Sequence, residues 1–168
     1  MGLDRLSGLY RQVLLDHAHN PRNKRSVADY TGQMELLNPT CGDAIVVQYR
    51  MEDDVLVDVG FTGYGCSISI ASASMMTEVM KGQTLEQAEQ LIEAFNYIIG
   101  GSPAKKVDLD SLADELKDAY FLEGVKQFPA RYKCAVLAWK ALEMGIGQVE
   151  LLEGLTMGQQ EKVSEMDE

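Results

Sequence analysis

Hydrophobic positions near the start of the chain recur at helical spacing. From residue 3 to 19 the apolar side chains fall three or four positions apart, which is typical of an amphipathic helix, and Asn20-Pro21 ends the pattern because proline disfavours helix in the preceding residue. The pattern then changes to alternating apolar and polar residues in three short segments, at 33–38, 44–51 and 55–61. Polar breaks between these segments predict three antiparallel strands in an up-down-up meander.

Helical spacing returns after the third strand. Residues 66–80 carry apolar side chains on more than one face, which predicts a largely buried helix closed by Gly82. Thr84 and Gln87 then have the spacing of a capping box, and the apolar stripe behind them reaches Gly100-Gly101. We therefore expect two consecutive helices here, the second of them at the surface.

The last third of the chain is less regular. We expect a short helix within 110–119 and irregular structure over 120–128. Pro129 suits the first turn of a final helix, and Gly145 and Gly147 are expected to end it. Trp139 is expected to pack within this helix.

Composition fits one ordinary folded domain. A chain of 168 residues with 46% hydrophobic and 24% charged residues is close to the average for globular proteins, which predicts a single domain at 1–155. The acidic, polar stretch 156–168 has too little apolar surface to offset the entropy of ordering it, so we expect a disordered tail. The fold class predicted is α+β, with a three-stranded antiparallel sheet packed against several helices.

Charge and hydropathy exclude several function classes. The formal net charge of −11 argues against binding to nucleic acids or anionic membranes. No apolar stretch approaches the roughly 20 residues that span a bilayer, and the first residues are polar where a signal peptide would have its apolar core. We therefore expect a cytoplasmic protein with neither a nucleic-acid nor a membrane partner.

Three widely spaced cysteines are the candidate functional residues. In a meander, the turn after the first strand and the exit of the third strand share one end of the sheet, so Cys41 and Cys66, 25 residues apart, should lie close together. Asp43, two positions from Cys41, can face the same cation across a tight turn. Cys134 lies 68 residues beyond Cys66, and nothing local shows that it joins them.

The surroundings of the cysteines favour thiolates. Cys66 opens a helix, whose free N–H groups lower the pKa of a thiol, and Cys134 is flanked by Arg131 and Lys133. Three thiolates with one carboxylate suit tetrahedral zinc, and thiolates also suit iron–sulfur centres. A free cysteine is also commonly a small buried hydrophobe, so the spacing alone leaves both interpretations open.

A set of ordered motifs carries a family resemblance over about residues 7–145. The motifs are Leu15-Asp16-His17, Asn20-Pro21-Arg22-Asn23, Asn38-Pro39-x-Cys41-Gly42-Asp43, Phe61-x-Gly63-x-Gly65-Cys66-x-Ile68-Ser69, Ala71-Ser72-Ala73-Ser74 and Pro129-x-Arg131-x-x-Cys134-Ala135. With these motifs in this order, the chain resembles the IscU/SufU (NifU N-terminal-type) iron–sulfur cluster assembly proteins. It is nearest the SufU branch, because Lys133 stands where IscU-type proteins carry a histidine and because residues 100–125 look like a short insertion.

The resemblance implies a function for these residues. It implies that Cys41, Asp43, Cys66 and Cys134 hold zinc, or transiently iron or a [2Fe–2S] cluster. It also implies that Cys41 accepts sulfane sulfur from a cysteine desulfurase, a SufS-like pyridoxal-phosphate enzyme, with downstream Suf assembly proteins as further partners. We hypothesise that the docked desulfurase supplies a replacement ligand, a histidine, and that Arg131 orients Asp43 or screens the site.

Two other functions remain as alternatives, and the positions of the histidines argue against a third. An IscU-like scaffold would assemble a [2Fe–2S] cluster and pass it on, and a structural zinc module would bind partners without transferring sulfur. A cysteine–histidine hydrolase would need a histidine beside a cysteine, and neither His17 nor His19 is placed to provide one. The two histidines point to different faces of their helix, so we expect His17 to pack or form hydrogen bonds at the helix end and not to share a metal with His19.

Overall fold

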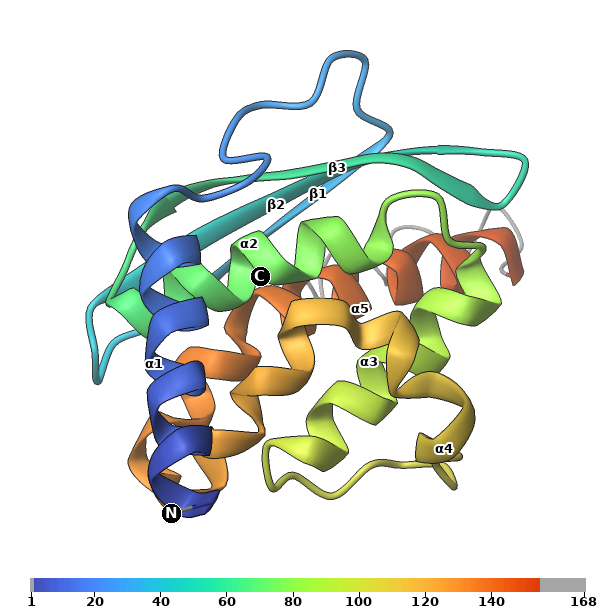
Figure 1. Ribbon diagram of the computed structural model, residues 1–168. Helices are drawn as coiled ribbons and strands as arrows, with labels where there is room; N and C mark the ends of the chain where they lie inside the picture. The colour runs from blue at the N-terminus through green and yellow to red at the C-terminus, as the bar shows by residue number, and fades with distance from the viewer. Residues whose placement is uncertain (1, 155–168) are drawn as a thin grey trace.

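A computed structural model describes residues 2–154 of the chain (Figure 1), so the tail predicted at 156–168 lies outside the described residues. The elements follow in the order α1 (Gly2–His19), β1 (Gly32–Asn38), β2 (Asp43–Glu52), β3 (Val55–Tyr64), α2 (Ser67–Met80), α3 (Leu85–Ile98), α4 (Leu109–Leu112), the 3₁₀ helices η1 (Asp114–Gln127) and η2 (Pro129–Arg131), and α5 (Tyr132–Gly154). The meander, the first helix and the two helices after the sheet are confirmed. α3 also begins with the predicted capping box at Thr84 and Gln87.

The sheet is antiparallel throughout, in the order β1-β2-β3. Asn38 at the end of β1 pairs with Asp43 at the start of β2, and Ala44 pairs with Tyr64 at the end of β3. The β1–β2 turn and the exit from β3 therefore lie at the same end of the sheet. This register positions the candidate functional site.

Helices cover one face of the sheet, as Figure 1 shows, which confirms the α+β fold class. α2 and α5 pack directly on the strands and on each other. The core between them is apolar, and Trp139 stacks on Phe95 of α3 with ring centroids 3.9 Å apart, as expected of a residue in the packing of its helix. None of the helices within residues 2–154 has the length and hydrophobicity needed to cross a bilayer.

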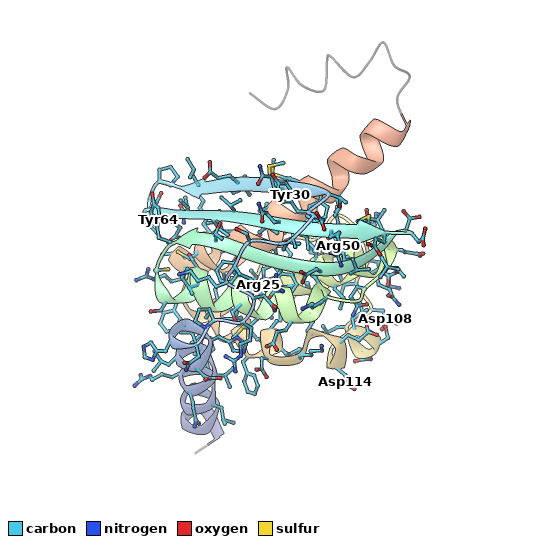
Figure 2. The ribbon with its side chains drawn as sticks, turned by 90° about the horizontal axis from the view of Figure 1, so that it is seen from above. Arg25, Tyr30, Arg50, Tyr64, Asp108 and Asp114 are labelled. Atoms are coloured by element: carbon cyan, nitrogen blue, oxygen red, sulfur yellow. The ribbon has the colours of Figure 1, made fainter. Side chains whose placement is uncertain are left out.

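The segment between α1 and β1 lies across the opposite face of the sheet (Figure 1). Val27 is buried there, and its N–H donates to Oε1 of Gln48 at 2.9 Å. Figure 2 looks onto this face, with Arg25 and Arg50 labelled. Arg25 donates to both carboxylate oxygens of Asp58, at 3.0 and 3.1 Å, so the segment is fixed to β3.

The expected helix within 110–119 is correct only at its start, and the expected irregular structure over 120–128 is wrong, because a 3₁₀ helix runs through most of it. α4 has four residues, and the chain then continues as the 3₁₀ helix η1, with a break at Lys117 (φ 51°, ψ −134°). The buried positions of η1 are spaced three apart, at Leu116, Ala119, Leu122 and Val125. A period of three suits a 3₁₀ helix, because its side chains at i and i+3 lie above one another. This spacing is the physical reason for the difference.

The predicted end of the last helix is also wrong, because α5 continues past Gly145 and Gly147 to Gly154. A Cβ added to Gly145 would lie 3.0 Å from the ring of Tyr49. Gly145 therefore serves the close approach of α5 to β2, and its lack of a side chain does not end the helix.

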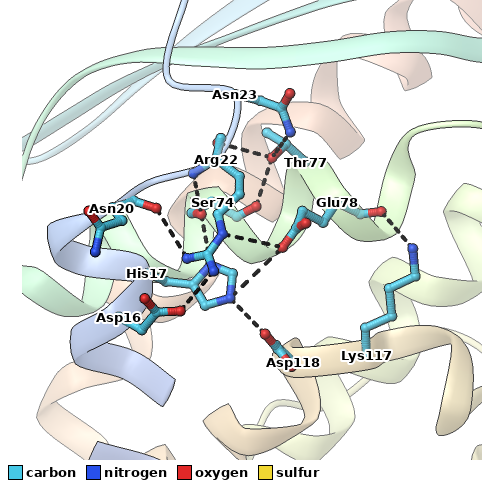
Figure 3. A network of polar contacts seen from close by, with 10 residues as sticks. All are labelled: Asp16, His17, Asn20, Arg22, Asn23, Ser74, Thr77, Glu78, Lys117 and Asp118. Atoms are coloured by element: carbon cyan, nitrogen blue, oxygen red, sulfur yellow. Dashed lines mark hydrogen bonds and ion pairs between the residues drawn. The ribbon is translucent and has the colours of Figure 1, made fainter. Parts of the chain in front are cut away.

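His17 is fully buried and ties three elements together (Figure 3). Its Nδ1 lies 2.8 Å from Oγ of Ser74 in α2, and its Nε2 lies 2.9 Å from Oδ2 of Asp118 in η1. Ser74 Oγ also accepts from the backbone N–H of Arg22 at 2.8 Å. His19 is exposed. The expected hydrogen-bonding role of His17 at the helix end is confirmed.

Candidate metal centre

Three segments meet at the end of the sheet where β1 ends and β2 begins. The β1–β2 turn carries Cys41, the start of α2 carries Cys66, and the start of α5 carries Cys134. The carbonyl of Asn38 closes the turn by accepting from the N–H groups of Cys41 (3.2 Å) and Gly42 (2.9 Å). Register and helix packing together therefore bring cysteines from distant parts of the chain to one place.

Cys41, Asp43 and Cys134 form a tight group. The Sγ atoms of Cys41 and Cys134 are 3.1 Å apart, and one ligand atom from each of the three residues lies within 4.8 Å of the others. Cys134 is fully buried, Asp43 is nearly so, and Cys41 is partly exposed. The position of Cys134, which the sequence left open, is thus beside Cys41.

Cys66 lies next to this group without completing it. It is the N-cap residue of α2, and its backbone N–H donates to Oδ1 of Asp43 at 2.8 Å. Its Sγ is 3.4 Å from Oγ of Ser69 and does not belong to the set of mutually close ligand atoms. The structure therefore gathers three of the four predicted ligands, with the fourth anchored beside them through its backbone.

The electrostatics at Cys134 oppose the expectation from the sequence. Burial raises the pKa of the Cys134 thiol far above its ordinary value, and the neighbouring Cys41, Cys66 and Asp43 raise it further. Lys133 is exposed, and its charge does not offset this burial. The flanking basic residues thus do not offset the effect of burial, and a cation bound between the sulfurs would favour the thiolate.

Arg131 faces the same cluster from the exposed end of η2. The pKa of its guanidinium is raised by interaction with the side chain of Cys134 and then by Cys66 and Cys41. Its interactions are therefore with the thiols, whereas the hydrogen bonds that the Asp43 carboxylate accepts from described residues come from the backbone of Cys66 and from Asn38.

Two residues that were not predicted as site residues shape the position of Asp43. A Cβ added to Gly65 would lie 2.7 Å from Oδ1 of Asp43, so the carboxylate occupies the space that a side chain would take. Asn38 is 5% exposed, and its Nδ2 lies 3.4 Å from Oδ2 of Asp43 and 3.8 Å from Sγ of Cys134. The sequence indicated these two residues only through their positions in the motifs that contain Cys41 and Cys66.

Comparison with known families fits this arrangement. Residues 9–135 match the model of the NifU-like N-terminal domain, which covers most of the chain and all of the proposed ligands. The chain belongs to the NifU-like N-terminal domain family. The resemblance inferred from the motifs is confirmed.

Two relatives of this NifU-like domain have informative names. A Bacillus subtilis protein named zinc-dependent sulfurtransferase SufU is 46% identical over 145 residues, which cover 86% of this chain and 94% of the relative. A Streptococcus pyogenes protein named iron–sulfur cluster assembly scaffold protein IscU is 38% identical over 158 residues, covering 93% and 94%. The family thus includes relatives named for either of the two functions considered above.

Solved structures confirm the fold of the NifU-like domain. A crystal structure of the N-terminal part of a nitrogen-fixing NifU-like protein from Brucella abortus superposes with a TM-score of 0.71. The comparison covers 84% of this chain and 94% of that chain at 22% identity. At that identity the likeness concerns the fold.

The donor set of the NifU-like domain fits zinc. Thiolates and a carboxylate are ordinary zinc ligands, and structural and catalytic zinc sites are commonly four-coordinate. Two thiols and a carboxylate already lie within reach of one ion, and Cys66, whose backbone N–H donates to Asp43, is the fourth ligand expected from the sequence. Soft sulfur donors also suit an iron–sulfur cluster, so the donor set alone does not select between the two.

Proposed function

We propose that this domain serves iron–sulfur cluster assembly as a zinc-dependent sulfur acceptor, and that Cys41 takes sulfane sulfur from a cysteine desulfurase. The observation that carries the proposal is the group formed by Cys41, Asp43 and Cys134, in which one thiol is accessible and the other is fully buried. The SufU name of the 46% identical relative supports zinc over a resident cluster.

Each residue has a distinct part in this proposal. Cys134 and Asp43, both buried, serve as ligands together with Cys66. A bound zinc ion would supply the positive charge that keeps these thiols deprotonated. Cys41 is the nucleophile because it lies on a turn and is partly exposed, where a donor can reach it.

The sulfur transfer is balanced without an added oxidant or reductant. The Cys41 thiolate attacks the outer sulfur of a persulfide on the desulfurase, and a new S–S bond forms on Cys41. The S–S bond of the donor breaks, and the donor cysteine leaves as a thiolate. The transferred sulfur keeps its oxidation level throughout.

Arg131 contributes positive charge at the solvent-exposed side of the site. Zn²⁺ with three thiolates and one carboxylate carries a formal charge of about −2, which repels an incoming anionic persulfide. The exposed guanidinium faces the sulfurs and offsets part of that charge. We therefore assign Arg131 to screening of the site.

A persulfide transfer assay tests the proposal. The zinc-loaded domain is incubated anaerobically with its desulfurase and cysteine, and persulfidated peptides are mapped by mass spectrometry. The parent should gain one sulfur on Cys41, and Cys41→Ser should gain none. Uptake of sulfur by Cys41→Ser at the parent's rate would overturn the assignment.

The scaffold function is the second candidate, favoured by the 38% identical relative with that name. Anaerobic reconstitution with iron and sulfide, followed by absorption spectroscopy and metal analysis, separates the two. The sulfur-acceptor proposal expects bound zinc and no stable cluster. A cluster at one per chain that displaces zinc would favour the scaffold.

A further inference from the structure

Asn38 contacts three of the four proposed ligand residues. Its backbone carbonyl accepts from the N–H of Cys41 at 3.2 Å, and its side-chain Nδ2 lies between Oδ2 of Asp43 (3.4 Å) and Sγ of Cys134 (3.8 Å). Asn38 is 5% exposed, so solvent competes little with these contacts. It is fixed at the end of β1 by its pairing with Asp43 in the sheet.

The direction of the amide follows from its neighbours. A carboxylate and a thiolate are both acceptors, so the NH₂ end of Asn38, which is a donor, is the end that suits them. The opposite orientation would bring the amide oxygen against the Asp43 carboxylate without a proton between them. The amide therefore presents a donor to the oxygen of Asp43 and the sulfur of Cys134, the two atoms proposed to bind the ion.

The four proposed ligands differ in their other partners. Asp43 accepts from the backbone of Cys66, Cys134 contacts Asn38, and the Cys66 thiol contacts Ser69. Within the described residues, the hydrogen-bonding contact of the Cys41 thiol is with Cys134, itself a proposed ligand. Cys41 is thus the ligand whose thiol has no hydrogen bond from outside the ligand set among those residues, while the charge of Arg131 acts on all three cysteines.

We propose that Asn38 is a positioning residue that holds Asp43 and Cys134 in their ligating positions and leaves Cys41 as the ligand free to depart. This inference rests on the proposed function, because it explains why one cysteine of the set is the nucleophile. Partners of this kind, which orient metal ligands without touching the metal, commonly change metal affinity 10- to 100-fold when they are replaced.

Two substitutions of similar size test the role of the amide. Asn38→Leu removes the donor, and Asn38→Asp replaces it with a negative charge facing Asp43 and Cys134. We expect zinc affinity, measured by competition with a chromogenic chelator, to fall about 10- to 100-fold for Asn38→Leu and further for Asn38→Asp. The absorption spectrum of the cobalt-substituted protein should change in both variants.

Matched controls separate this role from a general effect on folding. Gln48→Leu removes a side-chain amide from the middle of β2, where it contacts Val27, and should leave zinc affinity and the cobalt spectrum unchanged. Thermal unfolding of each metal-free variant shows that it is folded before its affinity is compared.

Equal zinc affinity and an unchanged cobalt spectrum for Asn38→Leu and the parent would overturn the inference and leave sulfur transfer to Cys41 standing. If the affinity falls as expected while Cys41→Ser still accepts sulfur at the parent's rate, the positioning of the ligands by Asn38 is supported and the proposed function fails.

Discussion

Replacing Gly65 with alanine should weaken metal binding specifically. The added Cβ would lie 2.7 Å from Oδ1 and 3.2 Å from Cγ of Asp43, and 3.0 Å from Cβ of Ser69. Ordinary contact begins near 3.4 Å, so the carboxylate would have to move by about 0.7 Å. The buried β-carbon of Ser69 on the other side leaves the methyl group little room to avoid this.

The magnitude follows from the bond that this movement breaks. Oδ1 of Asp43 accepts from the N–H of Cys66 at 2.8 Å, and the same carboxylate is a proposed ligand. A hydrogen bond to a charged group contributes about 1.5–3 kcal/mol, which corresponds to roughly a 10- to 150-fold loss of zinc affinity if the bond is lost. The cost arises because Asp43 is displaced from both the amide and the metal.

Competition titration with a chelator measures this loss. Gly8→Ala is a suitable control, because it lies in a helix where an added Cβ meets nothing within 4 Å, and its zinc affinity should equal that of the parent. Zinc affinity of Gly65→Ala within twofold of the parent's would refute the placement of Asp43 among the ligands.

Three further substitutions test the fold. Asp58→Asn should lower the free energy of unfolding by about 1 kcal/mol at neutral pH, since Arg25, followed by Lys81, holds the pKa of the Asp58 carboxyl below its usual 3.8. A lowered pKa means that the contribution is present above about pH 4 and lost at lower pH, so denaturant titrations of the two proteins should converge in acid; a constant difference at all pH values would contradict the ion pair. Thr84→Ala should cost about 1 kcal/mol by removing the cap of α3, and no change in the urea midpoint would argue against the capping box. Phe95→Ala should cost about 3–5 kcal/mol, because it leaves a cavity against the buried ring of Trp139, and a calorimetric loss below 1 kcal/mol would contradict that packing.

Local patterns predicted the parts of the fold that local interactions determine. The alternation of apolar residues identified the meander, and the spacing of Thr84 and Gln87 identified a helix start whose cap is made by those two side chains. The proximity of Cys41 and Cys66 also followed from topology, because both lie where strands of the meander end.

Long-range packing determined what the sequence pattern could not show. Cys134 reaches Cys41 because α5 packs on β1 and β2, and no spacing within 132–144 encodes that contact. α5 continues past Gly145, which lies against the ring of Tyr49, so this glycine reflects close packing and does not mark a helix end. The family resemblance supplied the ligand set that spacing alone left open.

X-ray absorption at the zinc edge is the most direct test of the four-ligand centre. For the zinc-loaded protein, the account predicts three sulfur ligands at ~2.3 Å and one oxygen at ~2.0–2.2 Å from a single ion. Cys66→Ser and Cys134→Ser should each reduce the sulfur count by one. Two sulfur ligands in the parent, with no change on replacing Cys66, would contradict the claim that all three cysteines hold the metal.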